Sequence, residues 1–169
     1  MNTTTTHPQS SGRPIDRWFA NYSADHVNPV NQKIHYIAVP LILWSVTALL
    51  WCIPLLATME RMGFRSGFWS ALAMFAAWMF YFRASRMLGF GMLLVFVAMS
   101  WLNFWLYNTF GGTFLLQLGI GVFVVAWIAQ FVGHKIEGAK PSFLTDLVYL
   151  MIGPAWVLAK GMRRFGLAY

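Results

Sequence analysis

Three histidines occupy positions beside long apolar segments, where ionisable side chains are rare. His26 and His35 lie around the start of the first such segment and His134 at the end of a later one, whereas His7 falls in a polar tail. Glu137 follows His134 by three residues, so both side chains would share one face of a helix. Imidazole binds zinc, iron, copper and nickel, and a carboxylate shifts the preference toward the harder ions. These residue types therefore favour a metal centre or catalytic use.

Each histidine of this group has a polar residue four positions before it, one turn away on the same face of a helix. These neighbours are Tyr22, Asn31 and Gln130. We expect them to orient the imidazoles by hydrogen bonding without binding the metal ion themselves. Two or three histidines with one carboxylate form the ligand set of non-haem Fe(II) oxygenases, and zinc uses a similar set with a bound water. The residues alone leave both metals open.

The elements that must position these residues belong to a membrane protein. Hydrophobic residues make up 59% of the 169-residue chain and charged residues 10%, against about 25% charged in an ordinary soluble domain. The formal net charge is +7, but the 12 Lys and Arg residues are scattered between apolar segments, as contact with membrane lipids favours. This distribution argues against nucleic acid as a partner. The single cysteine, Cys52, excludes an internal disulfide and a cysteine-based zinc site.

The pattern of polar and apolar segments predicts an all-α fold, a polytopic helical membrane protein with about four transmembrane helices. Residues 1–14 are expected to form a disordered tail, and residues 15–169 a single membrane-embedded domain. From Ile15 to Tyr22, apolar residues recur at helical spacing with polar residues between them. This spacing predicts an N-terminal amphipathic helix at the membrane interface.

Four uncharged runs are candidates for crossing the hydrocarbon layer. They cover residues 34–59, 66–82, 87–108 and 113–133. Asn28-Pro29 predicts the start of the first of these helices, because asparagine caps free N–H groups and proline suits the first helical turn. Paired glycines and an asparagine predict a tight turn at 108–112. A further run, 143–159, is interrupted by Gly153-Pro154, which predicts a re-entrant or interfacial hairpin rather than a crossing.

The basic residues predict the orientation of these helices. Four crossings place ten of the 12 Lys and Arg residues on the side of the N terminus, and only Arg61 and Arg65 on the other side. A fifth crossing would leave seven against five. The positive-inside rule therefore favours four crossings with both termini in the cytoplasm. In that topology the start of the first crossing and the end of the fourth share a face, so the three histidines can meet on the cytoplasmic side.

Two motifs in this order resemble the Mpo-type family of small membrane proteins. The first is Tyr22-x3-His26-x4-Asn31-x3-His35-x4-Pro40, and the second is Ala126-Trp-Ile-x-Gln-Phe-x-Gly-His134-x2-Glu137-x3-Pro141. The resemblance covers residues 15–160, with Ser142 where the family pattern has a small alanine. It implies an Fe(II)-dependent dioxygenase that uses O2 to convert 2-hydroxy fatty acids into fatty acids one carbon shorter. It also implies that His26, His35 and His134 are iron ligands, and that Glu137 is a ligand or an acid that supports one.

The substrate would bind the metal through its carboxylate and hydroxyl, with its alkyl chain among the apolar residues of the crossings; Lys33 and Lys135 are candidates for holding the carboxylate. We expect the bacterial inner membrane, or the endoplasmic reticulum if the chain is eukaryotic. The alternative is a non-enzymatic membrane protein that binds metal or haem, or a scaffold for lipid enzymes. Transport has the least support, because no ionisable residue lies at the centre of a crossing. The oligomeric state is open.

Overall fold

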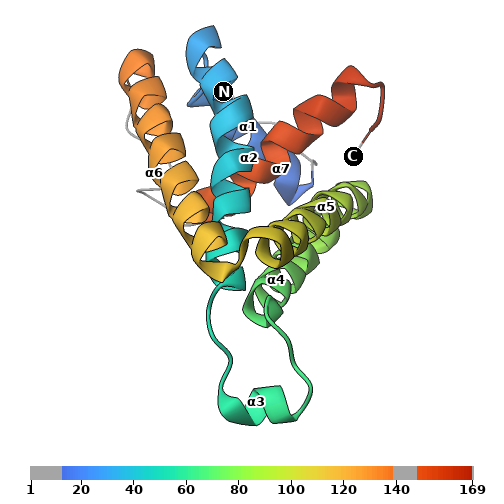
Figure 1. The fold of residues 1–169 in the computed structure, drawn as a ribbon. Coiled ribbons are helices and arrows are strands. Elements are labelled where there is room, and N and C mark those ends of the chain that lie inside the picture. Colours follow the sequence, from blue (N-terminus) through green and yellow to red (C-terminus); the bar gives the residue numbers. More distant parts are fainter. Residues whose placement is uncertain (1–12, 139–147, 169) are drawn as a thin grey trace, which may run out of the picture.

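The computed structural model describes residues 13–138 and 148–168, and these residues form seven α-helices and no strand (Figure 1). The helices are α1 Pro14–Ala24, α2 Pro29–Trp51, α3 Ala57–Arg61, α4 Phe68–Ala84, α5 Arg86–Phe110, α6 Gly112–Glu137 and α7 Val148–Arg164. The predicted all-α fold is confirmed. The predicted disordered tail falls almost wholly outside the described residues, and the division into tail and single domain stays a prediction.

Three of the described helices, α2, α5 and α6, are long and apolar enough to cross a membrane. They correspond to the first, third and fourth predicted crossings and indicate a membrane protein. The second predicted crossing corresponds to α4, which has 17 residues. At 1.5 Å per residue α4 is about 26 Å long, shorter than a hydrocarbon layer of about 30 Å. A fourth crossing by α4, extended by flanking arginines, stays a prediction.

Local sequence signals account for three helix boundaries, two of which the sequence analysis predicts. Asn28 caps α2, its side-chain oxygen accepting a hydrogen bond from the Val30 N–H at 2.9 Å, as predicted. The predicted turn before α6 is also confirmed and narrows to Gly111, whose φ of 86° favours glycine. The first uncharged run, however, does not stay helical to its end. Helix α2 ends at Trp51 because Pro54 lacks an N–H and disfavours helical conformation in the residue before it.

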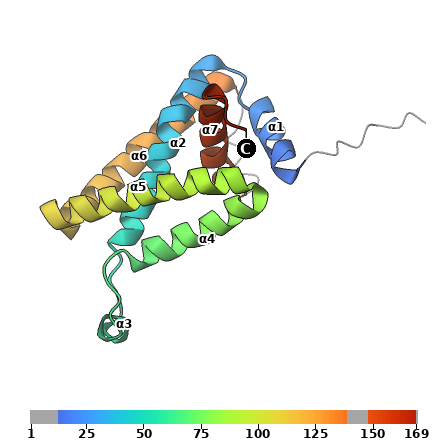
Figure 2. The same ribbon diagram turned by 90° about the vertical axis from the view of Figure 1, so that its right-hand side faces the viewer.

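The long helices form two antiparallel pairs that diverge like the arms of a V (Figure 1). One arm is α2 with α6 and the other is α4 with α5, and the turn between α5 and α6 joins the arms at the closed end. The short helix α3 projects beyond this end (Figure 2). Helices α1 and α7 pack on each other at the open end. The start of α2 and the end of α6 therefore lie together at the open end, close to α1 and α7.

The predicted hairpin in residues 143–159 is wrong for the described part of this segment, which belongs to helix α7. A single helix runs through Gly153 and Pro154, so no break occurs there. Proline removes only one helical hydrogen bond, and packing of the residues around it offsets that loss. Ile152, Ala155 and Trp156 are buried in a core cluster shared with α1, α4 and α5. Residues 143–147 of the predicted hairpin lie outside the described residues.

Helix α1 has the amphipathic character predicted for it. Ile15, Phe19 and Tyr22 are buried in the same core cluster, while Arg17 is exposed. The apolar face of α1 thus packs against the protein, chiefly against α7, and this contact fixes the position of the loop that follows α1.

Candidate metal centre

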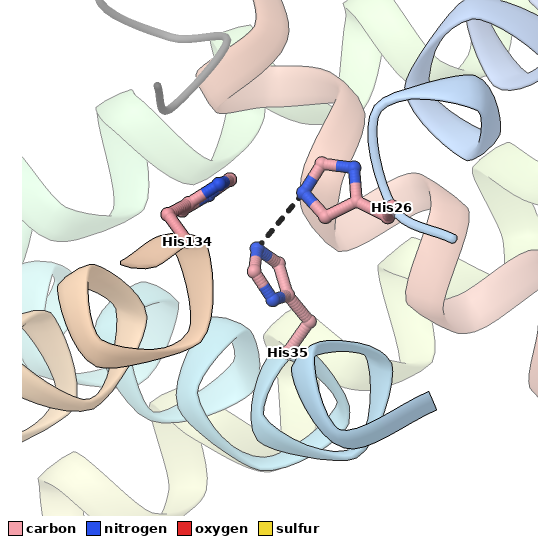
Figure 3. Close-up of side chains that lie close together, drawn as sticks. All are labelled: His26, His35 and His134. Atoms are coloured by element: carbon pink, nitrogen blue, oxygen red, sulfur yellow. Dashed lines mark hydrogen bonds between the residues drawn. The ribbon is translucent and has the colours of Figure 1, made fainter. Parts of the chain in front are cut away.

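Three histidines from separate segments meet at the open end of the V. His26 lies in the loop between α1 and α2, His35 in the second turn of α2, and His134 in the last turn of α6 (Figure 3). One ring nitrogen of each lies within 4.8 Å of one ring nitrogen of the other two. All three side chains are buried, with 1%, 1% and 5% of their surface exposed. The antiparallel packing of α2 and α6 thus brings together residues that are far apart in the sequence.

The hydrogen bonds of two histidines determine which ring nitrogens are free. Nδ1 of His26 lies 2.6 Å from the main-chain oxygen of Tyr22, and Nδ1 of His35 lies 2.9 Å from that of Asn31. A carbonyl oxygen can only accept, so both Nδ1 atoms donate and carry the hydrogen. Both Nε2 atoms therefore have a free lone pair, and they face each other at 3.0 Å. Such lone pairs repel unless a proton or a metal ion lies between them.

A shared proton fits this pair less well than a metal ion. Burial lowers the pKa of His26 below its ordinary value, and its hydrogen bond to Tyr22 offsets this only in part. Two imidazole nitrogens that bind one metal ion at about 2.1 Å each lie about 3.0–3.4 Å apart, depending on the angle between them. The spacing of the two Nε2 atoms therefore suits a metal ion.

His134 adds a further unsatisfied group to this cluster. Its ring lies 5.2 Å from the ring of His26 and 5.0 Å from that of His35, measured between centroids. Its Nδ1 is buried and has no hydrogen-bond partner among the described residues. A buried polar atom without a partner is costly, so a ligand at this position would stabilise the site.

Glu137 lies beside the cluster and joins the end of α6 to the start of α2. Its Oε1 accepts hydrogen bonds from the main-chain N–H groups of Val27 at 2.9 Å and Asn28 at 3.0 Å. Its Oε2 accepts from the Asn28 N–H at 3.0 Å and from Asn31 Nδ2 at 2.9 Å. The group of side chains whose ligand atoms converge consists of the three histidines without Glu137. Glu137 therefore holds the segment that carries His26 against the end of α6, and we call this role a clamp.

All three expected supporting residues lie at the site. Two of them, Tyr22 and Asn31, bind the imidazoles through their main-chain oxygens and not, as expected, through their side chains. The Tyr22 ring stacks on the His26 ring, 4.1 Å apart and tilted by 14°, while the Asn31 side chain binds Glu137. Gln130 is buried and lines the cavity beside the histidines.

A cavity of about 170 Å³ begins at the histidines and extends between α2, α4, α6 and α7. Apart from the histidines, Gln130 and two tyrosines, its described lining is apolar or aromatic: Val39, Ile42, Leu43, Val46, Ala77, Trp127, Leu150, Met151, Gly153 and Pro154. No Lys or Arg is among these described lining residues. Lys33 and Lys135, the candidates for holding a carboxylate, are exposed and lie outside the lining.

Comparison with known proteins identifies the family of the chain that carries this site. Residues 13–165 match the sequence profile of the 2-hydroxy-palmitic acid dioxygenase Mpo1-like family. The chain belongs to this family. The curated 2-hydroxy-palmitic acid dioxygenase MPO1 of Saccharomyces cerevisiae is 27% identical over 147 residues, which cover 86% of this chain and 78% of the yeast protein. No solved structure matches the chain. The predicted family membership is confirmed, and both motifs lie in the matched range.

The site of this Mpo1-like protein also includes two aromatic residues that the sequence analysis missed. Tyr81 of α4 lines the cavity and donates a hydrogen bond at 2.8 Å to the main-chain oxygen of Met151 in α7. Trp156 of α7 packs against His26, with ring centroids 5.9 Å apart, and donates to Ser23 Oγ at 2.8 Å. Neither residue has a helical spacing to a histidine, so only the packing of α4 and α7 could reveal their place in the site.

Proposed function

We propose that this Mpo1-like protein is an Fe(II)-dependent dioxygenase that converts 2-hydroxy fatty acids into fatty acids one carbon shorter. The observation that carries the proposal is the pair of free Nε2 atoms of His26 and His35, facing each other at 3.0 Å at the polar end of an apolar cavity. The name of the yeast relative supports the substrate class. The overall reaction balances when C1 leaves as carbon dioxide and one O2 also yields water.

In this proposal the three imidazoles hold the iron and Glu137 positions His26. Both carboxylate oxygens of Glu137 already accept hydrogen bonds, which favours the supporting role over that of a ligand. Fe(II), when bound, supplies the electrons that make O2 reactive toward the substrate. Three imidazoles that converge on one point suit a non-haem ion, because a haem iron has at most two positions for protein ligands.

The cavity favours an anionic substrate with an alkyl chain. Three neutral imidazoles leave the charge of a divalent ion uncompensated, and the described lining holds neither a carboxylate nor a Lys or Arg. A buried carboxylate is costly without a partner of opposite charge, so the substrate's head group belongs at the metal ion. The apolar wall from Val39 to Leu43 then accommodates the first part of the chain. A 2-hydroxy acid can bind through both its carboxylate and its hydroxyl.

The side chains around the head group orient the substrate and exclude water. Tyr22 and Gln130 line the same end of the cavity as the histidines and offer a hydroxyl and an amide there. Trp156, only 2% exposed, covers His26 on the side of α7. Exclusion of water keeps a reactive oxygen species from side reactions.

The test uses full-length protein purified without oxygen and loaded with Fe(II). We expect oxygen uptake with 2-hydroxypalmitate but not with palmitate, and a product one carbon shorter by mass spectrometry. His134→Ala should lower the rate by about a hundredfold, the upper end of the effect of removing a residue that supports a metal ligand. Protein that binds iron but consumes no oxygen would favour the non-enzymatic alternative. Protein that neither retains iron nor consumes oxygen would refute the proposal.

We also propose that the histidines and both termini face the cytoplasm, in the bacterial inner membrane or, in a eukaryote, at the endoplasmic reticulum. The distribution of basic residues supports this orientation: at the open end of the V, α7 carries Arg163 and Arg164 in its last turn.

A further inference from the structure

The cavity at the histidines is too small for a long alkyl chain. Its volume is about 170 Å³. A protein cavity of about 150 Å³ holds a single benzene molecule, or roughly 25 Å³ per carbon. On this scale the cavity holds about seven carbons. The remainder of a chain of sixteen carbons must lie elsewhere.

A second cavity of about 380 Å³ adjoins the first. It lies between α2, α5 and α7, and its described lining contains no ionisable side chain. Its walls include Met92, Val95 and Met99 of α5 and Val157 and Leu158 of α7. Figure 2 shows the N-terminal half of α5 passing beneath α7 in this region.

Two residues line both cavities, Leu43 of α2 and Pro154 of α7. Leu43 follows His35 by two helical turns, so it lies about 12 Å from the histidine along the helix axis. An extended alkyl chain advances roughly 1.25 Å per carbon, so it would reach Leu43 after nine or ten carbons. By volume or by length, at least about six carbons of a sixteen-carbon chain lie beyond Leu43.

We propose that the alkyl chain of the substrate passes between Leu43 and Pro154 into the second cavity, and that Leu43 determines which chain lengths bind. The identity of the head group at the histidines rests on the proposed function; the path of the chain rests on the two cavities. Together they have room for about twenty carbons. Selection among chain lengths would be steric. Bilayer lipid is as apolar as the cavity wall, so burial alone does not favour the cavity over the lipid for any part of the chain.

The alternative path follows α2 further, toward Val46 and Ala77. Both residues line the first cavity, and Val46 is 37% exposed on the outside of the protein. A chain on this path would end beside α2 and α4 rather than beside α5 and α7. The two paths place the end of the chain against different helices, which a labelling experiment can distinguish.

The first test is photolabelling of the full-length protein in nanodiscs with 2-hydroxypalmitate that carries a terminal diazirine. We expect label in residues 92–99 of α5 and 157–162 of α7, and its loss on competition with unlabelled 2-hydroxypalmitate. Label at Val46 or Ala77 that is lost on the same competition would overturn the proposal. So would label spread over lipid-facing residues without competition, since that pattern indicates a chain in the bilayer.

The second test is the affinity of 2-hydroxy acids with eight and sixteen carbons, measured by displacement of a fluorescent fatty acid. Leu43→Trp should weaken binding of the longer acid about tenfold or more and leave the shorter acid nearly unchanged. The matched control is Leu41→Trp, because Leu41 is 41% exposed and lines neither cavity. Equal affinity of Leu43→Trp and wild type for the longer acid would overturn the proposal.

A third variant keeps the test valid if Leu43→Trp fails to fold. Gly161 lines the second cavity but not the first, and a Cβ at this position meets no atom of the described residues within 4 Å. Gly161→Leu should therefore fold, partly fill the second cavity and weaken binding of the longer acid alone. If labelling and both variants behave as expected but no acid is turned over, the proposed function fails and the chain path stands. If the acid is turned over but label that is lost on competition lies at Val46, the proposed function stands and the proposed chain path fails.

Discussion

Replacing Glu137 by glutamine tests how the segments that carry the histidines are held together. The Glu137 carboxylate accepts hydrogen bonds from Val27 N–H, Asn28 N–H and Asn31 Nδ2, at 2.9 to 3.0 Å. Hydrogen bonds to a charged group contribute about 1.5–3 kcal/mol each when buried. Because this carboxylate is only half-buried, we expect about 1 kcal/mol from each.

Glutamine keeps one accepting oxygen, but its amide would point N–H groups at the N–H donors on the other side. We therefore expect Glu137→Gln to lose about 2 kcal/mol, which corresponds to about a thirtyfold change in an equilibrium constant. The loss should be found mainly in metal affinity, because the released loop carries His26 while His35 and His134 stay on their helices. Tenfold to hundredfold effects are typical of residues that support metal ligands.

The assay is titration with Co(II), whose visible absorption reports the ligand set as well as the affinity. If Glu137 only positions His26, Glu137→Gln weakens Co(II) binding about thirtyfold and the spectrum of the saturated protein matches wild type. If Glu137 is a metal ligand, the spectrum of the saturated protein changes. Glu60→Gln is the control, since Glu60 lies in α3 beyond the closed end of the V. Wild-type affinity in Glu137→Gln would refute the clamp, and an altered saturated spectrum would show that Glu137 binds the metal.

Two further predictions concern the packing and the orientation of the site. A Cβ on Gly133 would overlap Asn31 Oδ1, so Gly133→Ala should cost about 1–3 kcal/mol of stability and weaken Co(II) binding, whereas Gly121→Ala, with open space around it, should do neither. Thermal unfolding with Co(II) titration measures both effects, and equal behaviour of the two variants would contradict this account. In a chain whose single cysteine is replaced, Lys33→Cys should react with membrane-impermeant maleimide only from the cytoplasmic side and Arg61→Cys only from the opposite side. Labelling of both from one side would refute the proposed topology.

The parts of the fold that sequence reasoning predicted are those with a local physical cause. Asn28 and Gly111 act within one or two residues, through a side-chain cap and a positive φ, so their effect does not depend on the rest of the chain. The first uncharged run extends beyond the end of α2, because absence of charge alone does not predict a helix; Pro54 is the local signal for that end. Pro154 predicts a break, but the packing of α7 on α1, α4 and α5 is a tertiary effect that local signals do not contain.

The site was predictable to the extent that topology determines it. Once the first and last long helices are antiparallel, His35 and His134 must lie at the same end, and residue types alone then suggest metal. The contacts that orient the rings were not predictable in detail. The spacing of four identified Tyr22 and Asn31 as partners, but each contact uses a main-chain oxygen, which any residue type at that position would offer. The Asn31 side chain binds Glu137 instead. The role of Glu137 was not predictable from its spacing to His134, because its hydrogen-bond partners Val27, Asn28 and Asn31 lie on another segment.

The supporting role of Glu137 and the charge of the metal centre are linked. If Glu137 bound the metal, the site would carry a lower positive charge and have less need of an anionic substrate. Because the Glu137 oxygens are held by N–H groups, the ligands of a divalent ion would be three uncharged imidazoles, in a cavity whose described lining holds no carboxylate. In a medium of low dielectric this charge strongly favours an anionic ligand. Because Glu137 is not a ligand in this proposal, its replacement leaves the charge at the metal ion unchanged: a saturated Glu137→Gln protein should keep its preference for 2-hydroxypalmitate over the uncharged 2-hydroxypalmitamide, measured as relative affinity.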